Sequence, residues 1–297
     1  MHPNPSTPCE GYTPVEHAEL YTREIGQGQP ILILHGGPDF DHTYFLPELD
    51  RLADAFRLIY YDQRGRGRSA KNVQPEDVTI ESEVEDLERL REYFQLGSVA
   101  LLGHSWGAVL AMEYATRHPQ RVSHLVLMNT APASQSDYML LRQDRRARSP
   151  DDIAQLKAMA ASDAGYQEGD PEAVAAYYRI HFRAALQRPE HHEKIIQRLR
   201  ASFTQEGIRK SRAIEERLMQ ETWRLNEYDL LPRLRQLHIP TLVIHGEHDF
   251  VPRECAAHVA EAITGARFTV LKDCGHFSYL ECPDDVRKEI DEFFHSA

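Results

Sequence analysis

One stretch decides how this chain folds: Val99-Ala100-Leu101-Leu102-Gly103-His104-Ser105-Trp106-Gly107. It opens with an apolar run that is typical of a buried strand. A helix-like segment, Ala108–Arg117, follows directly. The pattern G-x-S-x-G between a strand and a helix predicts a sharp turn that lifts a serine hydroxyl above the edge of a sheet. Glycine at 103 and 107 meets the demand of this turn for small neighbours, so we interpret Ser105 as a nucleophile.

The segments around this stretch alternate between apolar runs and helix-length polar segments. We expect buried strands at Ile31–His35, Arg57–Asp62 and Val99–Gly103, and further strands at His124–Asn129, Thr241–His245 and Arg267–Leu271. We expect helices at Glu81–Gln95 and Pro283–Phe294, and an edge hairpin within Gly11–Glu24. Alternating strands and helices indicate βαβ units. The sequence therefore predicts an α/β fold with a mainly parallel sheet flanked by helices.

The alternation stops near Ala131 and resumes after about Glu227. The residues between them are polar, charged and helical, with no convincing strand. We interpret residues 132–227 as a helical cap domain inserted between strands, and residues 1–131 together with 228–297 as the core domain. The alternative is a set of ordinary surface helices.

The bulk properties exclude several classes of partner. The formal net charge is -12, which repels nucleic-acid phosphates and anionic membranes, so neither is an expected partner. Residues 1–8 lack the basic start and apolar run of a signal peptide, so we expect a cytoplasmic protein. Nothing in the sequence specifies an oligomeric state. The cysteines lack zinc-site spacing, so we expect free thiols, with an isolated disulfide as the alternative: Cys9, Cys255, Cys274 and Cys282.

A serine hydroxyl needs a base to remove its proton, and the acid that orients the base should precede it in the chain. Asp249 follows the strand Thr241–His245, and His276 follows the strand Arg267–Leu271. Both lie just past strand ends, where α/β sheets collect their active sites. We therefore predict Ser105 as nucleophile, Asp249 as orienting acid and His276 as base. Glu247 is the alternative acid.

Other polar residues near these positions have simpler interpretations. His35 and His104 flank the predicted site at positions suited to structural hydrogen bonds. His245 and His248 lie close to Asp249 in the sequence, which leaves a metal cluster as an alternative; because the triad explains the region, we expect no metal and no cofactor. We expect Cys274 to be a small buried packing residue rather than a reactive thiol.

An oxyanion needs two hydrogen-bond donors aimed at the developing negative charge. One is expected to be the backbone N–H of Trp106, the residue after the nucleophile. The second should come from the loop His35-Gly36-Gly37-Pro38-Asp39, which follows the first parallel strand. Glycine lets a backbone approach a ligand closely, so we choose Gly37. The alternative is a simple Gly-Pro turn.

The motifs together resemble the proline iminopeptidase group of α/β-hydrolases. The resemblance rests on His35-Gly36-Gly37-Pro38, Asp62-Gln63-Arg64-Gly65-Arg66-Gly67-Arg68-Ser69 and Gly103-His104-Ser105-Trp106-Gly107, and more weakly on Ile239-Pro240-Thr241 and Gly275-His276. It covers nearly the whole core and much less of the cap. It implies the α/β-hydrolase fold and the release of an N-terminal residue from peptides. The sequence departs from the group at Asp39, usually glycine, and at Phe250, which in some members is a glutamate that helps hold the substrate's amino group.

The resemblance also implies that carboxylates in the cap bind the free ammonium of the substrate. The candidates in that part of the chain are Glu215, Glu216 and Glu221. The alternative is that they form a solvated helix face. With Phe250 in place of glutamate, we expect a rather apolar substrate pocket, walled partly by Trp106 and Phe250.

Several functions are compatible with these residues. The first is hydrolysis of a small amide or short peptide through an acyl-enzyme on Ser105, and the alternative is a carboxylesterase or lactonase acting on small neutral substrates. C–C bond hydrolysis or dehalogenation would keep the fold, but dehalogenation prefers an aspartate nucleophile. A non-enzymatic receptor on the same scaffold is a further alternative, because a fold does not fix a function.

Overall fold

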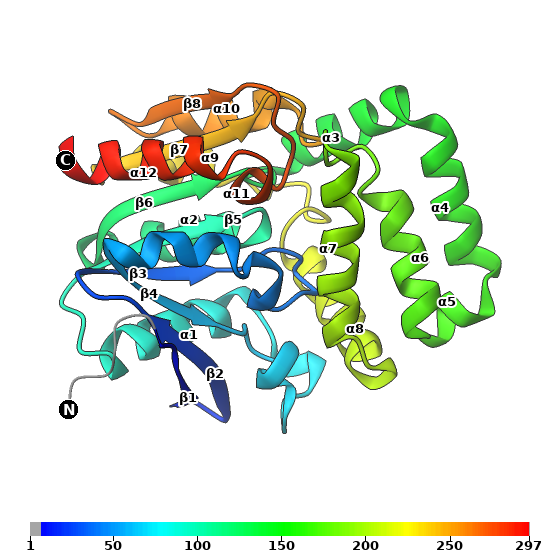
Figure 1. The fold of residues 1–297 in the computed structure, drawn as a ribbon, viewed down its shortest axis with the longest axis horizontal. Coiled ribbons are helices and arrows are strands. Elements are labelled where there is room, and N and C mark those ends of the chain that lie inside the picture. The colour runs from blue at the N-terminus through cyan, green and yellow to red at the C-terminus, as the bar shows by residue number, and fades with distance from the viewer. Residues whose placement is uncertain (1–6, 297) are drawn as a thin grey trace.

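The computed structural model describes residues 7–296 of the chain. Eight strands form one sheet in the order β1-β2-β4-β3-β5-β6-β7-β8. Their bounds are β1 Cys9–Val15, β2 Ala18–Ile25, β3 Gln29–Leu34, β4 Phe56–Tyr61, β5 Val99–His104, β6 Val122–Met128, β7 Thr241–Gly246 and β8 Arg267–Leu271. Neighbours from β4 to β8 pair in parallel, and β1 and β2 form an antiparallel hairpin at one edge (Figure 1). The mainly parallel sheet and the edge hairpin predicted from the sequence are confirmed.

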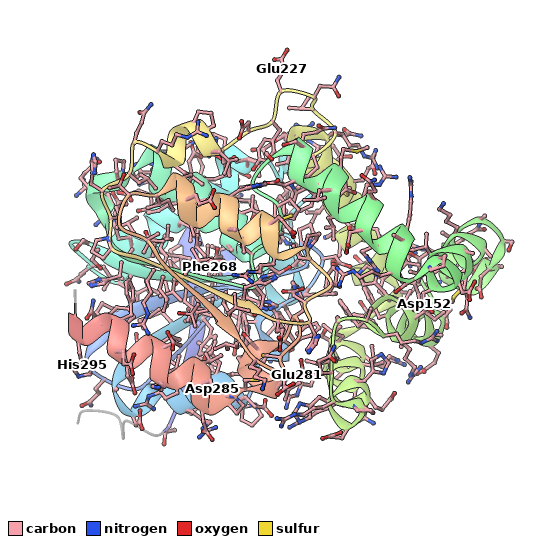
Figure 2. The ribbon with its side chains drawn as sticks, turned by 90° about the horizontal axis from the view of Figure 1, so that it is seen from above. Asp152, Glu227, Phe268, Glu281, Asp285 and His295 are labelled. Carbon is pink, nitrogen blue, oxygen red and sulfur yellow. The ribbon has the colours of Figure 1, made fainter. Side chains whose placement is uncertain are left out.

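Helices cover both faces of the sheet because side chains alternate along each strand. In β3, Leu32 and Leu34 pack on the face that carries the first group of helices, and Ile31 and Ile33 pack on the face covered by α12. Figure 2 shows α12, marked by Asp285 and His295, on one side of the sheet. The first group comprises α1 Ile80–Tyr93, α2 Trp106–Arg117, α9 Leu231–Leu234 and α10 Arg253–Ala262, and the other face carries α11 Ser278–Glu281 and α12 Pro283–Ser296.

The strand order reverses direction beside β5. The chain passes from β3 outward to β4, then crosses back to place β5 on the other side of β3, where Leu34 pairs with Gly103. In open α/β sheets a crevice forms at such a reversal, outside the carboxyl ends of the strands. The loop after β3 and the turn after β5 therefore meet at this crevice.

Of the helices between β6 and β7 in the chain, the first six form a group of their own. They are α3 Gln135–Arg148, α4 Pro150–Ser162, α5 Ala164–Glu168, α6 Pro171–His181, α7 Pro189–Ser202 and α8 Gln205–Glu221. They gather at the carboxyl ends of the parallel strands, away from the sheet faces (Figure 1), and we call them the inserted helices. The segments that enter and leave this group hydrogen-bond to each other: the N–H of Gln135 donates to Tyr228, and the N–H of Leu230 donates to Ala133, at 2.8 and 3.0 Å.

Two further expectations concern membranes and the N-terminus. Among the described residues, no helix is long and apolar enough to cross a membrane. The stretch that argued against a signal peptide lies mostly outside the described residues, which begin at residue 7.

Candidate active site

Ser105 occupies the turn between β5 and α2 in a strained backbone conformation, with φ 55° and ψ -118°. Such a conformation costs a residue with a side chain about 1–3 kcal/mol, so its surroundings must hold it in place. The N–H of Ser105 donates to the carbonyl of Met128 at 3.1 Å. A Cβ at Gly103 would lie 2.4 Å from the carbonyl oxygen of Gly107, and one at Gly107 would lie 2.2 Å from that of Leu34. The turn therefore requires both glycines.

Asp249 and His276 meet beside this turn from the ends of β7 and β8. The Nδ1 atom of His276 lies 2.8 and 3.0 Å from the two carboxylate oxygens of Asp249, and both side chains are buried. Burial alone would raise the pKa of Asp249, but the adjacent His276 and His245 and the hydrogen bonds it accepts hold that pKa well below its usual range. The carboxylate is therefore ionised at neutral pH and fixes the orientation of the imidazole, whose Nε2 is left for another partner.

Asn129 is a contact of this pair that the sequence analysis missed. Its amide nitrogen donates to Asp249 at 2.9 Å and to the carbonyl of Gly275 at 3.0 Å, while its amide oxygen accepts from Ser278 at 2.6 Å. Asn129 directly follows β6, so its place past the end of a buried strand was the signal that could have identified it. It ties the acid to the segment that carries His276.

His104 links the loop after β3 to the segment of His276. Its Nε2 lies 2.9 Å from the carbonyl oxygen of His276, which can only accept, so Nε2 carries the proton. Burial, reinforced by the charge on His276, lowers the pKa of His104 to about 3, so its Nδ1 is a bare acceptor. The Tyr44 hydroxyl, 2.8 Å away, therefore donates to Nδ1 and accepts from the N–H of Gly36 at 2.7 Å. This agrees with the structural role expected for His104.

The two predicted oxyanion donors lie at the same crevice. Gly37 has φ 121°, and a Cβ there would lie 2.2 Å from the backbone nitrogen of Asp39, so only glycine fits. Its N–H has no acceptor among the described residues. Trp106 is the first residue of α2, where an N–H precedes the start of intrahelical bonding. Gly37 also lines the cavity that contains Ser105, and the assignment of both N–H groups as oxyanion donors stays a prediction.

The side chain of Trp106 lies elsewhere than expected. It is fully buried in the hydrophobic core and packs edge-on against Trp223, with ring centroids 5.5 Å apart. The Trp106 side chain therefore does not line the cavity that lies over Ser105. Phe250 does line the cavity, as predicted.

A cavity of about 220 Å³ lies between the turn of Ser105 and the inserted helices. Ser105 and His276 share its lining with Gly36 and Gly37. Its other walls are mainly aromatic, and they include Phe40, Tyr138, Tyr166, Tyr177, Tyr178, Phe182, Trp223, Phe250 and Phe277. The inserted helices thus enclose a small chamber over the serine.

Of the three predicted cap carboxylates, the structure brings one to this cavity. Glu215 lines it. Glu216 instead pairs with Arg224 at the surface, and Glu221 accepts from the N–H of Ile80 at 2.9 Å, at the start of α1. These carboxylates project from different faces of α8, and the helical register decides which one points inward.

Asp39 supplies a second carboxylate to the cavity, so the pocket is less apolar than expected. It accepts a short hydrogen bond from the hydroxyl of Tyr178. Loss of solvent raises the pKa of Asp39. Burial, and then the negative charge of Asp39, raises the pKa of Glu215, while Arg212 opposes the rise. The negative charges of the two carboxylates therefore repel each other. A cation placed near them would stabilise both as anions.

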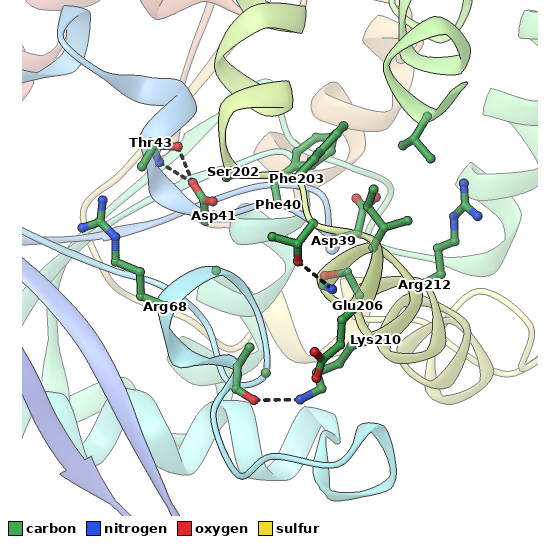
Figure 3. A pocket seen from close by; sticks show the side chains of 18 of the residues that line it. Asp39, Phe40, Asp41, Thr43, Arg68, Ser202, Phe203, Glu206, Lys210 and Arg212 are labelled. Atoms are coloured by element: carbon green, nitrogen blue, oxygen red, sulfur yellow. Dashed lines mark hydrogen bonds between the residues drawn. The ribbon is translucent and has the colours of Figure 1, made fainter. Parts of the chain in front are cut away.

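A larger hollow of about 840 Å³ adjoins this chamber and shares Asp39, Phe40, Tyr178 and Arg212 with it. Figure 3 looks into it: Arg68 and Arg212 lie on opposite sides in that view, with Asp39 between them. Lys210 also lines the hollow and donates to the carbonyl of Ala70 at 2.8 Å. The two cavities therefore share part of one wall.

The alternative metal ligands, His245 and His248, and the alternative acid, Glu247, lie near Asp249 in the sequence. His245 is buried beside Asp249, whereas His248 is 44% exposed next to Glu247, so the two histidines face different surroundings. Among the described residues, the one acidic and histidine group close enough to hold a metal is exposed, and comprises Glu247, His248 and Asp273. Glu247 accepts from the N–H of Asp273 at 3.1 Å rather than contacting His276.

The described cysteines are free thiols, as expected. Cys274 is fully buried in the core and packs there, in line with the role expected for it.

Comparison with known proteins places this site in a family. Residues 29–283 match the family described as the alpha/beta hydrolase fold. The chain belongs to the α/β hydrolase fold family. It is also 28% identical to a proline iminopeptidase of Lactobacillus helveticus, over 96% of this chain and 97% of the relative. The predicted fold and the resemblance to proline iminopeptidases are confirmed, and the chain is a hydrolase.

Solved structures agree with this assignment. The α/β hydrolase superposes on a proline iminopeptidase-related protein from Thermus thermophilus with a TM-score of 0.75 and 27% identity, covering 97% of this chain and 98% of that one. It also superposes on an enol-lactonase from Burkholderia xenovorans with a TM-score of 0.65 and 25% identity, covering 96% and 100%. Relatives of this α/β hydrolase therefore include both peptidases and lactonases.

Proposed function

We propose that this α/β hydrolase releases the N-terminal residue of short peptides or aminoacyl amides through an acyl-enzyme on Ser105. The observation that carries the proposal is the pair of carboxylates, Asp39 and Glu215, in the wall of the chamber that also holds Ser105. A substrate ammonium taken into a partly desolvated chamber must be paired, because an unpaired buried charge is costly. The proline iminopeptidase relatives support the same substrate class.

The contacts at the site support one role for each of the proposed residues. His276 takes the proton of the Ser105 hydroxyl on Nε2 as the serine oxygen attacks the substrate carbonyl. Asp249 holds the imidazole in the required tautomer through Nδ1 and stabilises its charged form. The oxyanion that develops on the carbonyl oxygen accepts from the N–H groups of Gly37 and Trp106.

The intermediate then collapses in two stages. His276 returns its proton to the leaving amine, the C–N bond breaks, and the acyl group stays on Ser105. Water next gives a proton to His276 and attacks the ester carbon, and the free amino acid leaves as Ser105 regains its proton. In this scheme the inserted helices act as a cap, residues 132–227, over a core of residues 1–131 and 228–297.

A charge-neutral substitution tests the ammonium site. Glu215→Gln should raise KM for an aminoacyl amide by about ten-fold or more, the loss of a charged hydrogen bond of roughly 1.5–3 kcal/mol, and should leave hydrolysis of a neutral ester nearly unchanged. Glu216→Gln is the matched control, because its carboxylate is on the same helix but pairs with Arg224 outside the chamber. Equal behaviour of both variants on both substrates would contradict the proposal.

The second candidate is an esterase or lactonase for small neutral substrates. The aromatic walls of the chamber and the likeness to an enol-lactonase favour it. It predicts efficient turnover of short esters and lactones, no cleavage of aminoacyl amides, and no effect of Glu215→Gln on either.

A further inference from the structure

Arg145 is a cation in the wall of the chamber that the proposed mechanism does not use. It lies on α3, is half-buried, and lines both the chamber and a small pocket next to it. It forms no ion pair with any carboxylate of the described residues, whereas its neighbour Arg148 pairs with Asp144. Loss of solvent lowers the pKa of Arg145. Keeping this charge beside the chamber therefore costs stability.

The guanidinium lies close to the reacting groups. Its central carbon is 5.0 Å from the centroid of the Phe250 ring, and the imidazole of His276 is 4.4 Å from the same centroid. The Phe250 ring thus contacts both the Arg145 guanidinium and the His276 imidazole. The cation gains some stabilisation from the ring face, but a ring does not neutralise it.

The chamber wall carries charges of both signs, from Asp39 and Glu215 and from Arg145 and Arg212. Burial raises the pKa of the Tyr177 hydroxyl; Glu215 adds to that rise and Arg145 opposes it. Burial also raises the pKa of the Tyr138 hydroxyl; Arg142 opposes that rise most and Arg145 less, while Glu215 adds to it. Both tyrosines line the chamber together with Glu215 and Arg145, so both charges act within the same wall.

We propose that Arg145 binds a carboxylate of the substrate, so that the enzyme favours substrates with an anion as well as a scissile carbonyl. The anion is either the C-terminal carboxylate of a dipeptide or an acidic side chain on the released residue. A planar guanidinium pairs with a carboxylate through two parallel hydrogen bonds, a geometry that suits the recognition of one anionic group on a ligand. The dipeptide form of this inference rests on the proposed aminopeptidase function.

Arg145 also has a structural contact that the test must separate from binding. Its Nη2 donates to the carbonyl of His181 at 3.3 Å, at the carboxyl end of α6, where a cation is favourable. Loss of that contact would lower the stability of the fold and affect all substrates alike. Loss of an anion site would affect only substrates that carry the anion.

Matched substrate pairs make this separation. One pair is a dipeptide and its C-terminal amide, a second is an α-glutamyl and an α-glutaminyl amide, and a third is a hemisuccinate ester and the matched butyrate ester. Arg145→Gln should lower kcat/KM about ten-fold or more for the anionic member of at least one pair and change its neutral partner less than two-fold. The first two pairs distinguish the sources of the carboxylate, and the ester pair tests Arg145 even if aminoacyl cleavage fails.

Two further variants complete the experiment. Arg146→Gln removes an exposed cation from the same helix and should leave every preference unchanged. Arg145→Lys keeps the charge and should restore part of the preference, and thermal unfolding of each variant reports the structural contribution. Equal losses on both members of all three pairs, or a wild-type enzyme with no preference in any pair, would overturn the proposal.

Discussion

Asn129 is a residue outside the proposed triad that positions the triad's acid, Asp249. Its two amide hydrogens hold Asp249 and the carbonyl of Gly275, and its backbone has φ 48°. We expect Asn129→Gly, which tolerates this backbone conformation, to lower kcat about ten- to hundred-fold with little change in KM, because a hydrogen bond to a charged group contributes roughly 1.5–3 kcal/mol. Steady-state kinetics on a neutral ester measure this split. A variant with normal kcat, or with a change confined to KM, would contradict the positioning role.

The raised pKa of Glu215 gives the proposed ammonium site a pH dependence. A carboxyl whose pKa is raised above its usual value near 4.3 keeps its proton to higher pH, and the neutral form cannot pair with a substrate ammonium. KM for an aminoacyl amide should therefore fall as pH rises from about 5 to 8. Measurement of KM across this range, with Glu215→Gln beside it, tests the sign of this dependence. The variant should show a weaker fall in KM, because only Asp39 still titrates beside the substrate ammonium. A KM that rises with pH in the parent would refute the prediction.

At the scale of elements, the junction of β5 and α2 depends on close backbone approach. A Cβ at Gly107 would meet the carbonyl oxygen of Leu34 at 2.2 Å, whereas one at Gly97 would meet nothing within 4 Å. Gly107→Ala should therefore destabilise the fold by roughly 1–3 kcal/mol or more and abolish turnover, since backbone must move. Gly97→Ala should change stability by less than about 0.5 kcal/mol. Urea unfolding of the two variants compares them directly, and equal stability would show that the junction is not tight.

Strands could be predicted from the local sequence where their burial requires a run of apolar residues. The strand expected at Thr241–His245 is found at Thr241–Gly246, and the one expected at His124–Asn129 is found at Val122–Met128. A buried strand is a continuous apolar run, which is readable without any partner. The inserted helices are different, because an amphipathic helix specifies one buried face and says little about what that face will pack against.

At the scale of the whole molecule, the parts of the site come from distant places in the chain. Ser105, Asp249 and His276 could be predicted because each follows a strand of a parallel sheet, and such strands end at one edge. The chamber wall could not be predicted in the same way. Whether Glu215 or Glu216 points inward depends on how α8 packs on the core, and Asp39 stood out in the sequence only as a departure from its group.

The central claim is that turnover passes through a covalent bond to Ser105, and one measurement tests it directly. The purified enzyme is treated with a fluorophosphonate, and its intact mass, modified peptide and residual activity are followed together, beside Ser105→Ala. We expect a single adduct on Ser105, loss of activity in step with labelling, and a variant that folds, takes up no label and turns over on the order of 10³-fold or more slowly. An enzyme that stays active when fully labelled, or a Ser105→Ala variant as active as the parent, would contradict the account.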